Sequence, residues 1–302
     1  MFLAIRFIDY SCQMSSLFLF LTMKKAVIIG LGLIGGSFAL ELKKRLNYRI
    51  EGIDNTPANL QKALELGIIE APTDYEHLTD AALVLVAVPV NYISQVLTLV
   101  LDKIGDDTLV MDVGSVKAPI CQAGAAHPRR KQFVAAHPMA GTEHSGPEAA
   151  LYDLFDGKVM ALCEVEKTTD WQLLDRALTL SKALNMRVKM MSPTDHDLHT
   201  AYVSHLSHVS SFMLGKTVLE IEKDEAQIFD LASTGFASTV RLAKSDAQMW
   251  TPIFTENKAN VLKALSEYIK NLQQFYHLLE TDQTVAITEV IHQANYIRKI
   301  LK

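Results

Sequence analysis

Six consecutive residues near the start of the chain have the types and spacing of a dinucleotide-binding turn. The run Gly30-Leu31-Gly32-Leu33-Ile34-Gly35 is a G-x-G-x-x-G motif between an apolar run and a helical pattern. Glycines allow a tight turn and a close approach of the backbone to a pyrophosphate, and the N-terminus of the following helix favours negative charge. We therefore predict that residues 30–35 bind the phosphates of a dinucleotide.

An acidic residue ends the second predicted strand, where the ribose of such a cofactor is bound. The Asp54 carboxylate is suited to accept a hydrogen bond from the ribose 2′-hydroxyl and repels the 2′-phosphate of NADP. Residues 55–57 are Asn-Thr-Pro and include no arginine. We predict NAD as the cofactor, with Val88 and Pro89, at the carboxyl end of a later strand, also lining the site. The alternative is that Asp54 is a solvated acid at a strand end.

One histidine is placed where it can exchange a proton with a bound substrate. His137 leaves a predicted buried strand, precedes Pro138 and is followed by a turn of small residues. Imidazole titrates near neutrality, and a histidine at the carboxyl end of a strand is exposed and oriented. We predict that His137 is catalytic, against the alternative of a purely structural histidine.

The elements that position these residues alternate between short β-branched runs and helical stretches, which is typical of βαβ units. An apolar run without alternation, such as residues 83–88, indicates a sheet covered by helices on both faces. The predicted fold class is α/β, with a Rossmann-type doubly wound parallel sheet over residues 23–191. The predicted strands are Ala26–Gly30, Arg49–Asp54, Ala82–Val88, Thr108–Val113, Gln132–Ala136, Lys158–Val165 and Arg187–Met191.

From residue 192 the pattern is helical throughout, so an all-α domain is predicted over residues 192–302. Its first helix is expected to start at Ser192 or Thr194 as N-cap and to run to about Glu222. Because the later helices carry many apolar residues, we predict a homodimer through this domain. The later helices are predicted at Ala226–Leu231, Thr239–Lys244, Trp250–Thr281 and Thr284–Leu301.

Composition limits the class of protein. The chain has 302 residues, 49% of them hydrophobic, which is enough to fill a core in each of two domains. The net charge is −5 and no basic run stands out, so we expect no nucleic-acid partner. The cysteines, Cys12, Cys121 and Cys163, are too few for a disulfide framework, which favours a reducing cytoplasm.

The first 22 residues are predicted to lie outside the fold. Their apolar runs are interrupted by Arg6, Asp9 and Gln13. Neither run reaches the roughly 20 residues that a membrane span needs, and no small-residue cleavage site follows. We expect Met23 to be the biological start and residues 1–22 to be a non-native start or a disordered extension.

Four histidines on the first predicted helix of the second domain raise the question of a metal. His196 and His199 form one H-x-x-H pair, and His205 and His208 form another. Catalytic zinc helices favour H-x-x-x-H, and no third ligand stands at a recognisable spacing. We therefore predict that the protein binds no metal.

Taken in order, the motifs of this chain resemble those of the prephenate dehydrogenase family, including its arogenate-specific and cyclohexadienyl relatives. The resemblance covers residues 23–302. It rests on Gly30–Gly36, Asp112–Lys117, His137–Gly146, Ser204–His208, and Arg241–Asp246 followed by Trp250.

This resemblance implies an NAD-dependent oxidative decarboxylation of prephenate to 4-hydroxyphenylpyruvate in tyrosine biosynthesis. The family's catalytic histidine falls on His137 and its partner serine, which bonds that histidine and the substrate hydroxyl, falls on Ser115. The residues that match substrate-binding positions are Thr142, Ser204, His208 and Arg241. Ser207 stands where many relatives have proline.

The residue types at these positions suit a dianionic substrate. A guanidinium such as that of Arg241 binds a carboxylate through two parallel hydrogen bonds. Ser204 and His208 are four residues apart and share one helix face. Ser211 continues this polar stripe, which is difficult to explain as part of a core.

Three other functions stay open. Arogenate dehydrogenase is the nearest alternative. A β-hydroxyacid dehydrogenase or imine reductase would need a catalytic lysine, and none occurs between Asp195 and Leu214. A nucleotide-binding protein without turnover would not need Ser115, His137 and Arg241 together.

Overall fold

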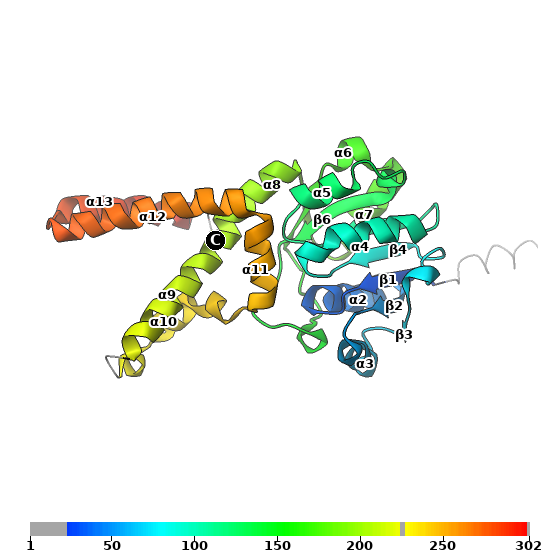
Figure 1. Ribbon diagram of the computed structural model, residues 1–302, viewed down its shortest axis with the longest axis horizontal. Helices are drawn as coiled ribbons and strands as arrows, with labels where there is room; N and C mark the ends of the chain where they lie inside the picture. Colours follow the sequence, from blue (N-terminus) through cyan, green and yellow to red (C-terminus); the bar gives the residue numbers. More distant parts are fainter. Residues whose placement is uncertain (1–22, 224–226, 301–302) are drawn as a thin grey trace, which may run out of the picture. The chain divides into compact units, whose positions relative to one another are not determined.

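The computed structural model describes residues 23–223 and 227–300, so the extension predicted over residues 1–22 lies outside the described residues. The chain divides into two compact units (Figure 1). The first, called the sheet unit, extends to His196 and also includes Ser245–Pro252. The second, the helical unit, comprises Asp197–Lys244 and the chain from Ile253 onward. The segment Ser245–Pro252, which the sequence assigns to the helical domain, thus lies in the sheet unit.

An eight-stranded sheet forms the centre of the sheet unit, in the order β3-β2-β1-β4-β5-β6-β7-β8. The chain leaves β1 to β2 on one side and returns to β4 on the other, which creates the switch point at which doubly wound folds bind ligands. The strands are β1 (Lys25–Ile29), β2 (Arg49–Ile53), β3 (Ala71–Pro72), β4 (Leu83–Val86), β5 (Leu109–Asp112), β6 (Phe133–Pro138), β7 (Val159–Cys163) and β8 (Arg187–Met191).

Two features of the sheet differ from the prediction. Strand β3 was not expected, because two residues are too short to show a hydrophobic period. Strand β7 pairs antiparallel with β6, whereas the other strand pairs of the sheet are parallel. Only a 3-10 turn, Pro147–Ala149, lies between β6 and β7, and a parallel return needs a longer crossover, usually a helix.

Helices follow the strands and pack along the sheet (Figure 1). The core strands β1, β4 and β5 are buried along their whole length, as expected for a sheet covered on both faces. The side chains of Cys121 and Cys163 are buried thiols, and burial raises the pKa of Cys121 to about 12. The helices are α2 (Leu33–Leu46), α3 (Pro57–Glu65), α4 (Val90–Lys103), α5 (Ala118–Gly124), α6 (Val165–Thr168) and α7 (Trp171–Ala183).

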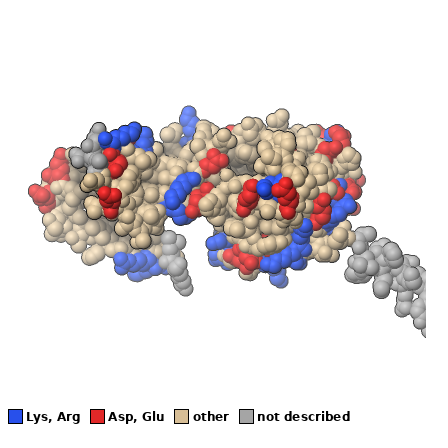
Figure 2. Space-filling view, turned by 90° about the horizontal axis from the view of Figure 1, so that it is seen from below, with Lys and Arg blue, Asp and Glu red and all other residues tan. Residues whose placement is uncertain are grey.

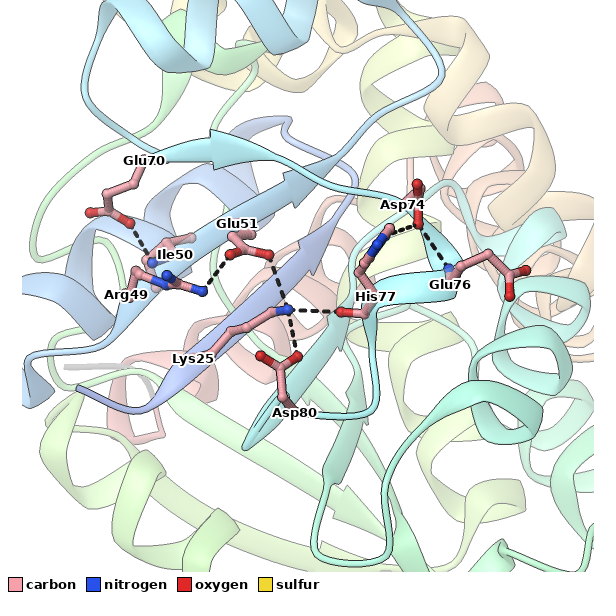
Figure 3. Close-up of polar contacts among 9 residues, drawn as sticks. All are labelled: Lys25, Arg49, Ile50, Glu51, Glu70, Asp74, Glu76, His77 and Asp80. Atoms are coloured by element: carbon pink, nitrogen blue, oxygen red, sulfur yellow. Dashed lines mark hydrogen bonds and ion pairs between the residues drawn. The ribbon is translucent and has the colours of Figure 1, made fainter. Parts of the chain in front are cut away.

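Polar contacts join the starts of β1 and β2 to the segment before β4 (Figure 3). The Lys25 Nζ atom, on a side chain that is 8% exposed, lies 3.1 Å from Glu51 Oε2 and 2.7 Å from Asp80 Oδ1. It also donates to the carbonyl oxygen of His77 at 2.8 Å. Arg49 pairs with the other Glu51 oxygen at 2.7 Å. Because a nearly buried ammonium needs such partners, these contacts fix the amino-terminal edge of the sheet, away from the predicted cofactor turn.

One long helical run opens the second half of the chain, as predicted. The Ser192 hydroxyl accepts from the backbone N–H of Asp195 at 3.0 Å, which confirms Ser192 as a helix cap. The run continues to Glu222, but Ala201–His205 adopts a π-helix, labelled η4, between α8 (Pro193–Thr200) and α9 (Leu206–Glu222). The wider turn forms with Ser207 just after it and without a proline ring, so proline is not the cause of this irregular turn.

The later helical elements are shorter than predicted. The helix expected over Trp250–Thr281 is interrupted at Asn257, and the two segments expected near 226–231 and 239–244 are 3-10 turns. No helix in the described part of the chain is long and apolar enough to cross a membrane. The elements are η5 (Ile228–Leu231), α10 (Thr234–Thr239), η6 (Arg241–Lys244), α11 (Ala247–Glu256), α12 (Lys258–Glu280), α13 (Thr284–Ala294) and η7 (Asn295–Lys299).

Candidate active site

The glycine-rich turn joins β1 to α2 and leaves room for a ligand. Gly30 has a φ of +94°, and a Cβ added to it would lie 2.5 Å from the Ala87 carbonyl oxygen. A Cβ on Gly35 would lie 1.9 Å from the Gly30 carbonyl oxygen, so neither position accepts a side chain. A Cβ on Gly32, by contrast, would meet nothing within 4 Å. The turn is therefore closed toward the sheet and open on the side from which a pyrophosphate would approach.

The start of α2 suits an anion. No side chain caps it and its first turn contains no acidic residue. Helix N-termini carry N–H groups without intrahelical partners and a partial positive charge, which together bind phosphate. Leu33 and Ile34 stand at this helix start, and Leu31 precedes it. These residues fit the diphosphate of a dinucleotide.

Asp54 holds the turn as well as facing the predicted ribose site. Its Oδ2 accepts from the backbone N–H of Leu31 at 2.9 Å, and its Oδ1 accepts from Thr56 N–H at 2.9 Å. Asn59 Nδ2 also reaches Oδ1 at 3.3 Å. Because two carboxylate oxygens offer about four acceptor positions, the carboxylate keeps capacity for a ribose hydroxyl. The Leu31 contact, which sequence reasoning missed, couples the second strand to the phosphate turn.

Val88 and Pro89 lie beside the same turn. A Cβ on Gly30 would lie 3.0 Å from the Val88 backbone nitrogen, which shows how closely the two segments approach. Pro89 occupies the cap position of α4 and is exposed, while Val88 is half-buried. The predicted cofactor residues of all three strand ends are thus grouped at the switch point of the sheet.

A fully buried ion pair supports the loop that carries Ser115. Asp112 and Lys117 are both 0% exposed and their side chains are in contact. Asp112 Oδ2 accepts from Gly114 N–H at 2.9 Å, and Lys117 Nζ donates to the carbonyl oxygen of Ala136 at 2.7 Å. Ala136 immediately precedes His137, so the pair links the loop after β5 to the end of β6. Sequence reasoning used these residues as a motif and did not predict that they would pair.

His137 contacts a second histidine. Its Nδ1 lies 2.8 Å from Nε2 of His196, and the rings meet edge to face with centroids 5.0 Å apart. Ser115 lies beyond the same sheet edge, because β5 and β6 are neighbours with Asp112 opposite Ala135. The hydrogen bond expected between Ser115 and His137 stays a prediction. Thr142 follows in the loop after β6, half-buried, and its hydroxyl accepts from His144 N–H at 3.2 Å.

The helical unit holds the other predicted substrate residues. His208 Nδ1 lies 3.0 Å from the carbonyl oxygen of Ser204, which lies in the π-helix. Burial lowers the pKa of His208, the bond to Ser204 opposes this, and the nearby Arg241 charge lowers it further. Arg241 is exposed at the start of η6. The unit therefore presents a neutral imidazole near a guanidinium.

Two buried residues fix these positions. Ser211, expected to continue the polar stripe, is 3% exposed and donates to the carbonyl oxygen of Thr239 at 3.0 Å, so its role in the structure is to anchor the segment before Arg241. Asn257, which sequence reasoning missed, donates from Nδ2 to the carbonyl oxygen of Asp197 at 2.7 Å and lies 3.2 Å from His205 Nδ1. It secures the π-helix.

The histidines considered as metal ligands have separate surroundings. His196 contacts His137, His205 contacts Asn257, and His208 contacts Ser204. Over the ranges that the structure describes, no group of three or more metal-ligating side chains comes together. That the protein binds no metal stays a prediction.

Comparison with models of known protein families shows which family the chain belongs to. Residues 38–190 match the model of the prephenate dehydrogenase nucleotide-binding domain, and residues 192–293 match that of the prephenate dehydrogenase dimerization domain. The chain belongs to the prephenate dehydrogenase family. This confirms the resemblance drawn from the motifs, and with it an NAD-dependent oxidoreductase with a Rossmann-type sheet followed by a helical domain.

Individual relatives agree. A prephenate dehydrogenase of Bacillus subtilis is 34% identical over 266 residues, covering 86% of this chain and 71% of the relative. A cyclohexadienyl dehydrogenase of Zymomonas mobilis is 28% identical, covering 92% of this chain and 96% of the relative. The crystal structure of prephenate dehydrogenase from A. aeolicus in complex with hydroxyphenyl propionate and NAD+ superposes with a TM-score of 0.84 at 32% identity, covering 93% of this chain and 99% of that one. Membership of this family leaves no support for the hydroxyacid dehydrogenase and non-catalytic alternatives.

Proposed function

We propose that this chain oxidatively decarboxylates prephenate with NAD+ and that His137 is the base for the 4-hydroxyl proton. The observation that carries the proposal is the position of His137 at the carboxyl end of β6, in the unit that also holds the glycine-rich turn. Ligands of doubly wound folds bind beyond this edge of the sheet. A base there stands on the same side as the predicted nicotinamide cofactor.

The proposed reaction has three bond changes. Bound NAD+ supplies the hydride acceptor for the hydrogen on C4 of the substrate. The bond from C1 to the ring carboxylate breaks, CO2 leaves, and the released electron pair completes the aromatic ring. His137 takes the 4-hydroxyl proton on Nε2 and returns it to the phenol oxygen of 4-hydroxyphenylpyruvate, so the histidine ends the cycle neutral.

The remaining predicted residues bind and orient the substrate in this proposal. The Arg241 guanidinium holds a carboxylate through two hydrogen bonds, which fixes the direction of the ring. Ser204 and His208 face the pyruvyl side chain, and Thr142 lines the site. Ser115 donates to or accepts from the 4-hydroxyl group once the substrate is bound.

One observation favours arogenate as a second substrate. A carbonyl oxygen only accepts, so His208 must donate from Nδ1 to Ser204, and in the neutral ring Nε2 is then an acceptor. An acceptor suits the ammonium group of arogenate better than the keto group of prephenate. Parallel measurements of kcat/KM with the two substrates decide the preference.

The central experiment measures NADH formation from prephenate by the wild-type protein and by His137→Asn. Positioned proton transfer contributes about 10²–10⁴-fold to rate, so kcat of the variant is expected to fall within that range. NAD+ affinity is expected to stay unchanged, because the predicted dinucleotide contacts lie on residues 30–35 and Asp54. A His137→Asn enzyme with wild-type kcat would contradict the proposed base.

We also propose a homodimer through the helical unit. Uncharged side chains form most of the visible surface, with charged side chains of both signs scattered over it (Figure 2). Leu272 and Tyr276 on α12 are 51% and 66% exposed, and Val285 and Ile291 on α13 are 76% and 48% exposed. Such exposed apolar faces are typical of protein interfaces. A monomeric mass by light scattering at micromolar concentration would contradict the dimer; a cytoplasmic location and the lack of a nucleic-acid partner stay predictions.

A further inference from the structure

His196 is a buried histidine that the proposed mechanism does not yet use. It lies on α8 and is 1% exposed, and its Nε2 is the atom that meets Nδ1 of His137 at 2.8 Å. The two residues are 59 positions apart in the chain, so only the fold brings them together. Because His196 is buried, water has little access to its side of this contact.

The position of the hydrogen in this contact determines whether His137 can act as a base. A hydrogen bond between two imidazole nitrogens needs a hydrogen on one and a lone pair on the other. A His137 ring that is to accept a proton on Nε2 must start neutral with its hydrogen on Nδ1. That hydrogen then points at His196, whose Nε2 must supply the lone pair. The opposite arrangement, with His196 as the donor, would place the His137 hydrogen on Nε2 and leave that nitrogen unable to act as a base.

We propose that His196 is a positioning residue that accepts the Nδ1–H of His137 and so holds the base in its reactive tautomer. This inference rests on the proposed role of His137. A carboxylate performs the same task in Ser-His-Asp triads. The difference is that a carboxylate favours the charged imidazolium, whereas a neutral imidazole orients the ring without stabilising its protonated form to the same degree. A base that must return its proton within the same turnover gains from a neutral partner.

The start of α8 holds His196 in place. The His196 backbone N–H donates to the Ser192 carbonyl oxygen at 3.0 Å. The Ser192 side chain caps the helix through the backbone N–H of Asp195 and itself donates to Asp195 Oδ2 at 2.7 Å. A capped first turn resists fraying, so the contact between the two histidines is built on a rigid element.

The test compares three variants on one helix. In His196→Gln the amide oxygen can occupy the place of Nε2 and accept from His137, whereas His196→Leu removes the acceptor. His199→Leu is the matched control, because His199 is exposed on the same helix. We expect kcat of His196→Leu to fall by about 10- to 100-fold, the range typical of partners that orient a functional histidine. KM for prephenate and NAD+ affinity are expected to stay constant, His196→Gln to recover much of the rate, and His199→Leu to match the wild type.

A spectroscopic measurement separates positioning from general damage. The ¹⁵N shifts of the His137 ring are expected to report the Nδ1–H tautomer in the wild-type protein and increased Nε2–H tautomer in His196→Leu. A wild-type protein with the hydrogen on Nε2 of His137 would overturn the inference even if the leucine variant did not fold. Wild-type kcat in His196→Leu together with a large loss in His137→Asn would also overturn it and leave the proposed base intact. Wild-type kcat in His137→Asn would instead overturn the proposed function.

Discussion

The two units fix their predicted functional side chains in different ways. In the sheet unit the support is buried and polar: the Asp112–Lys117 pair is 0% exposed and His196 is 1% exposed. In the helical unit Arg241 is exposed and His208 is half-buried. The base is therefore supported by buried polar neighbours, whereas in the helical unit buried residues such as Ser211 anchor the backbone and the Arg241 guanidinium itself is exposed. This difference separates residues whose loss should affect folding and kcat from residues whose loss should affect KM.

The largest expected effect on stability lies in the sheet unit. Replacing Lys117 with Met leaves the Asp112 carboxylate buried without its counter-charge, which typically costs about 3–5 kcal/mol. Denaturant unfolding should show this loss, and the exposed residue Lys131 gives the control variant Lys131→Met. Adding Asp112→Asn to Lys117→Met should recover part of the stability. Equal denaturant midpoints for Lys117→Met and the wild-type protein would show that the buried ion pair does not stabilise the sheet unit.

The next largest effect is expected on substrate binding by the helical unit. Arg241→Ala should leave stability unchanged, because the side chain is exposed, and should raise KM for prephenate by about 10- to 100-fold, the equivalent of a charge-assisted hydrogen bond. Arg241→Lys should recover little, since an ammonium cannot bind a carboxylate through a planar pair of donors. Lys244→Ala, on the same turn, is the control. A fall in kcat at constant KM would place Arg241 with the reacting groups instead.

Replacing Asn257 tests whether the stability of the helical unit also depends on a buried polar contact. Asn257→Ala removes a buried hydrogen bond to the Asp197 carbonyl oxygen, which also accepts from the Thr200 hydroxyl at 3.3 Å, so we expect a loss of about 0.5–1.5 kcal/mol, the net worth of one hydrogen bond. The exposed Asn271 on α12 supplies the matched variant Asn271→Ala. Thermal unfolding measures both. If the two variants were equally stable, the stability of the helical unit would not depend on this buried contact.

Features that depend on residues close together in the sequence could be predicted, and features that depend on distant residues could not. The glycine-rich turn, the Ser192 cap and the long helix to Glu222 depend on neighbours within a few residues, and these predictions were confirmed. The reversed direction of β7 depends on how the chain returns from β6, which no local pattern records. The helix break at Asn257 has no local signal, since a helical pattern continues through asparagine; the side chain donates to a carbonyl oxygen 60 residues away.

The candidate site follows the same rule. Residues 30–35, Asp54 and His137 stand at strand ends whose type and spacing are visible in the chain, so their grouping could be anticipated. The partner of His137 could not, because His196 was considered only beside the histidines that follow it on its own helix. Ser211 was assigned to the polar stripe from its spacing, yet its hydroxyl donates to a backbone carbonyl 28 residues away.

The smallest expected effect is a dependence of substrate preference on pH, through His208. Its pKa is lowered by burial, and Arg241 lowers it further, so the ring is neutral at pH 7 and Nε2 accepts. As the pH falls through this lowered pKa, below the usual value of about 6.5, the ring gains a proton and Nε2 becomes a donor suited to the keto oxygen of prephenate. The ratio of kcat/KM for prephenate to that for arogenate should therefore rise as the pH decreases, by about two- to tenfold, the net worth of one hydrogen bond.

The ratio reports the protonation of His208 separately from that of the proposed base, His137. Protonation of His137 at low pH would slow both substrates alike and cancels in the ratio, whereas protonation of His208 changes one side-chain contact in opposite directions for a keto group and an ammonium group. The free energy of unfolding should also decrease as the pH falls. A histidine whose pKa is lowered in the folded state contributes stability that is present above its unfolded-state pKa and is lost as the pH falls through its folded-state pKa. His208→Gln has no proton to gain, so its ratio should not vary with pH, while His199→Gln should keep the wild-type trend. A pH-independent ratio in the wild-type protein would show that His208 does not distinguish the two side chains and that the helical unit recognises its substrate through Arg241 and Ser204.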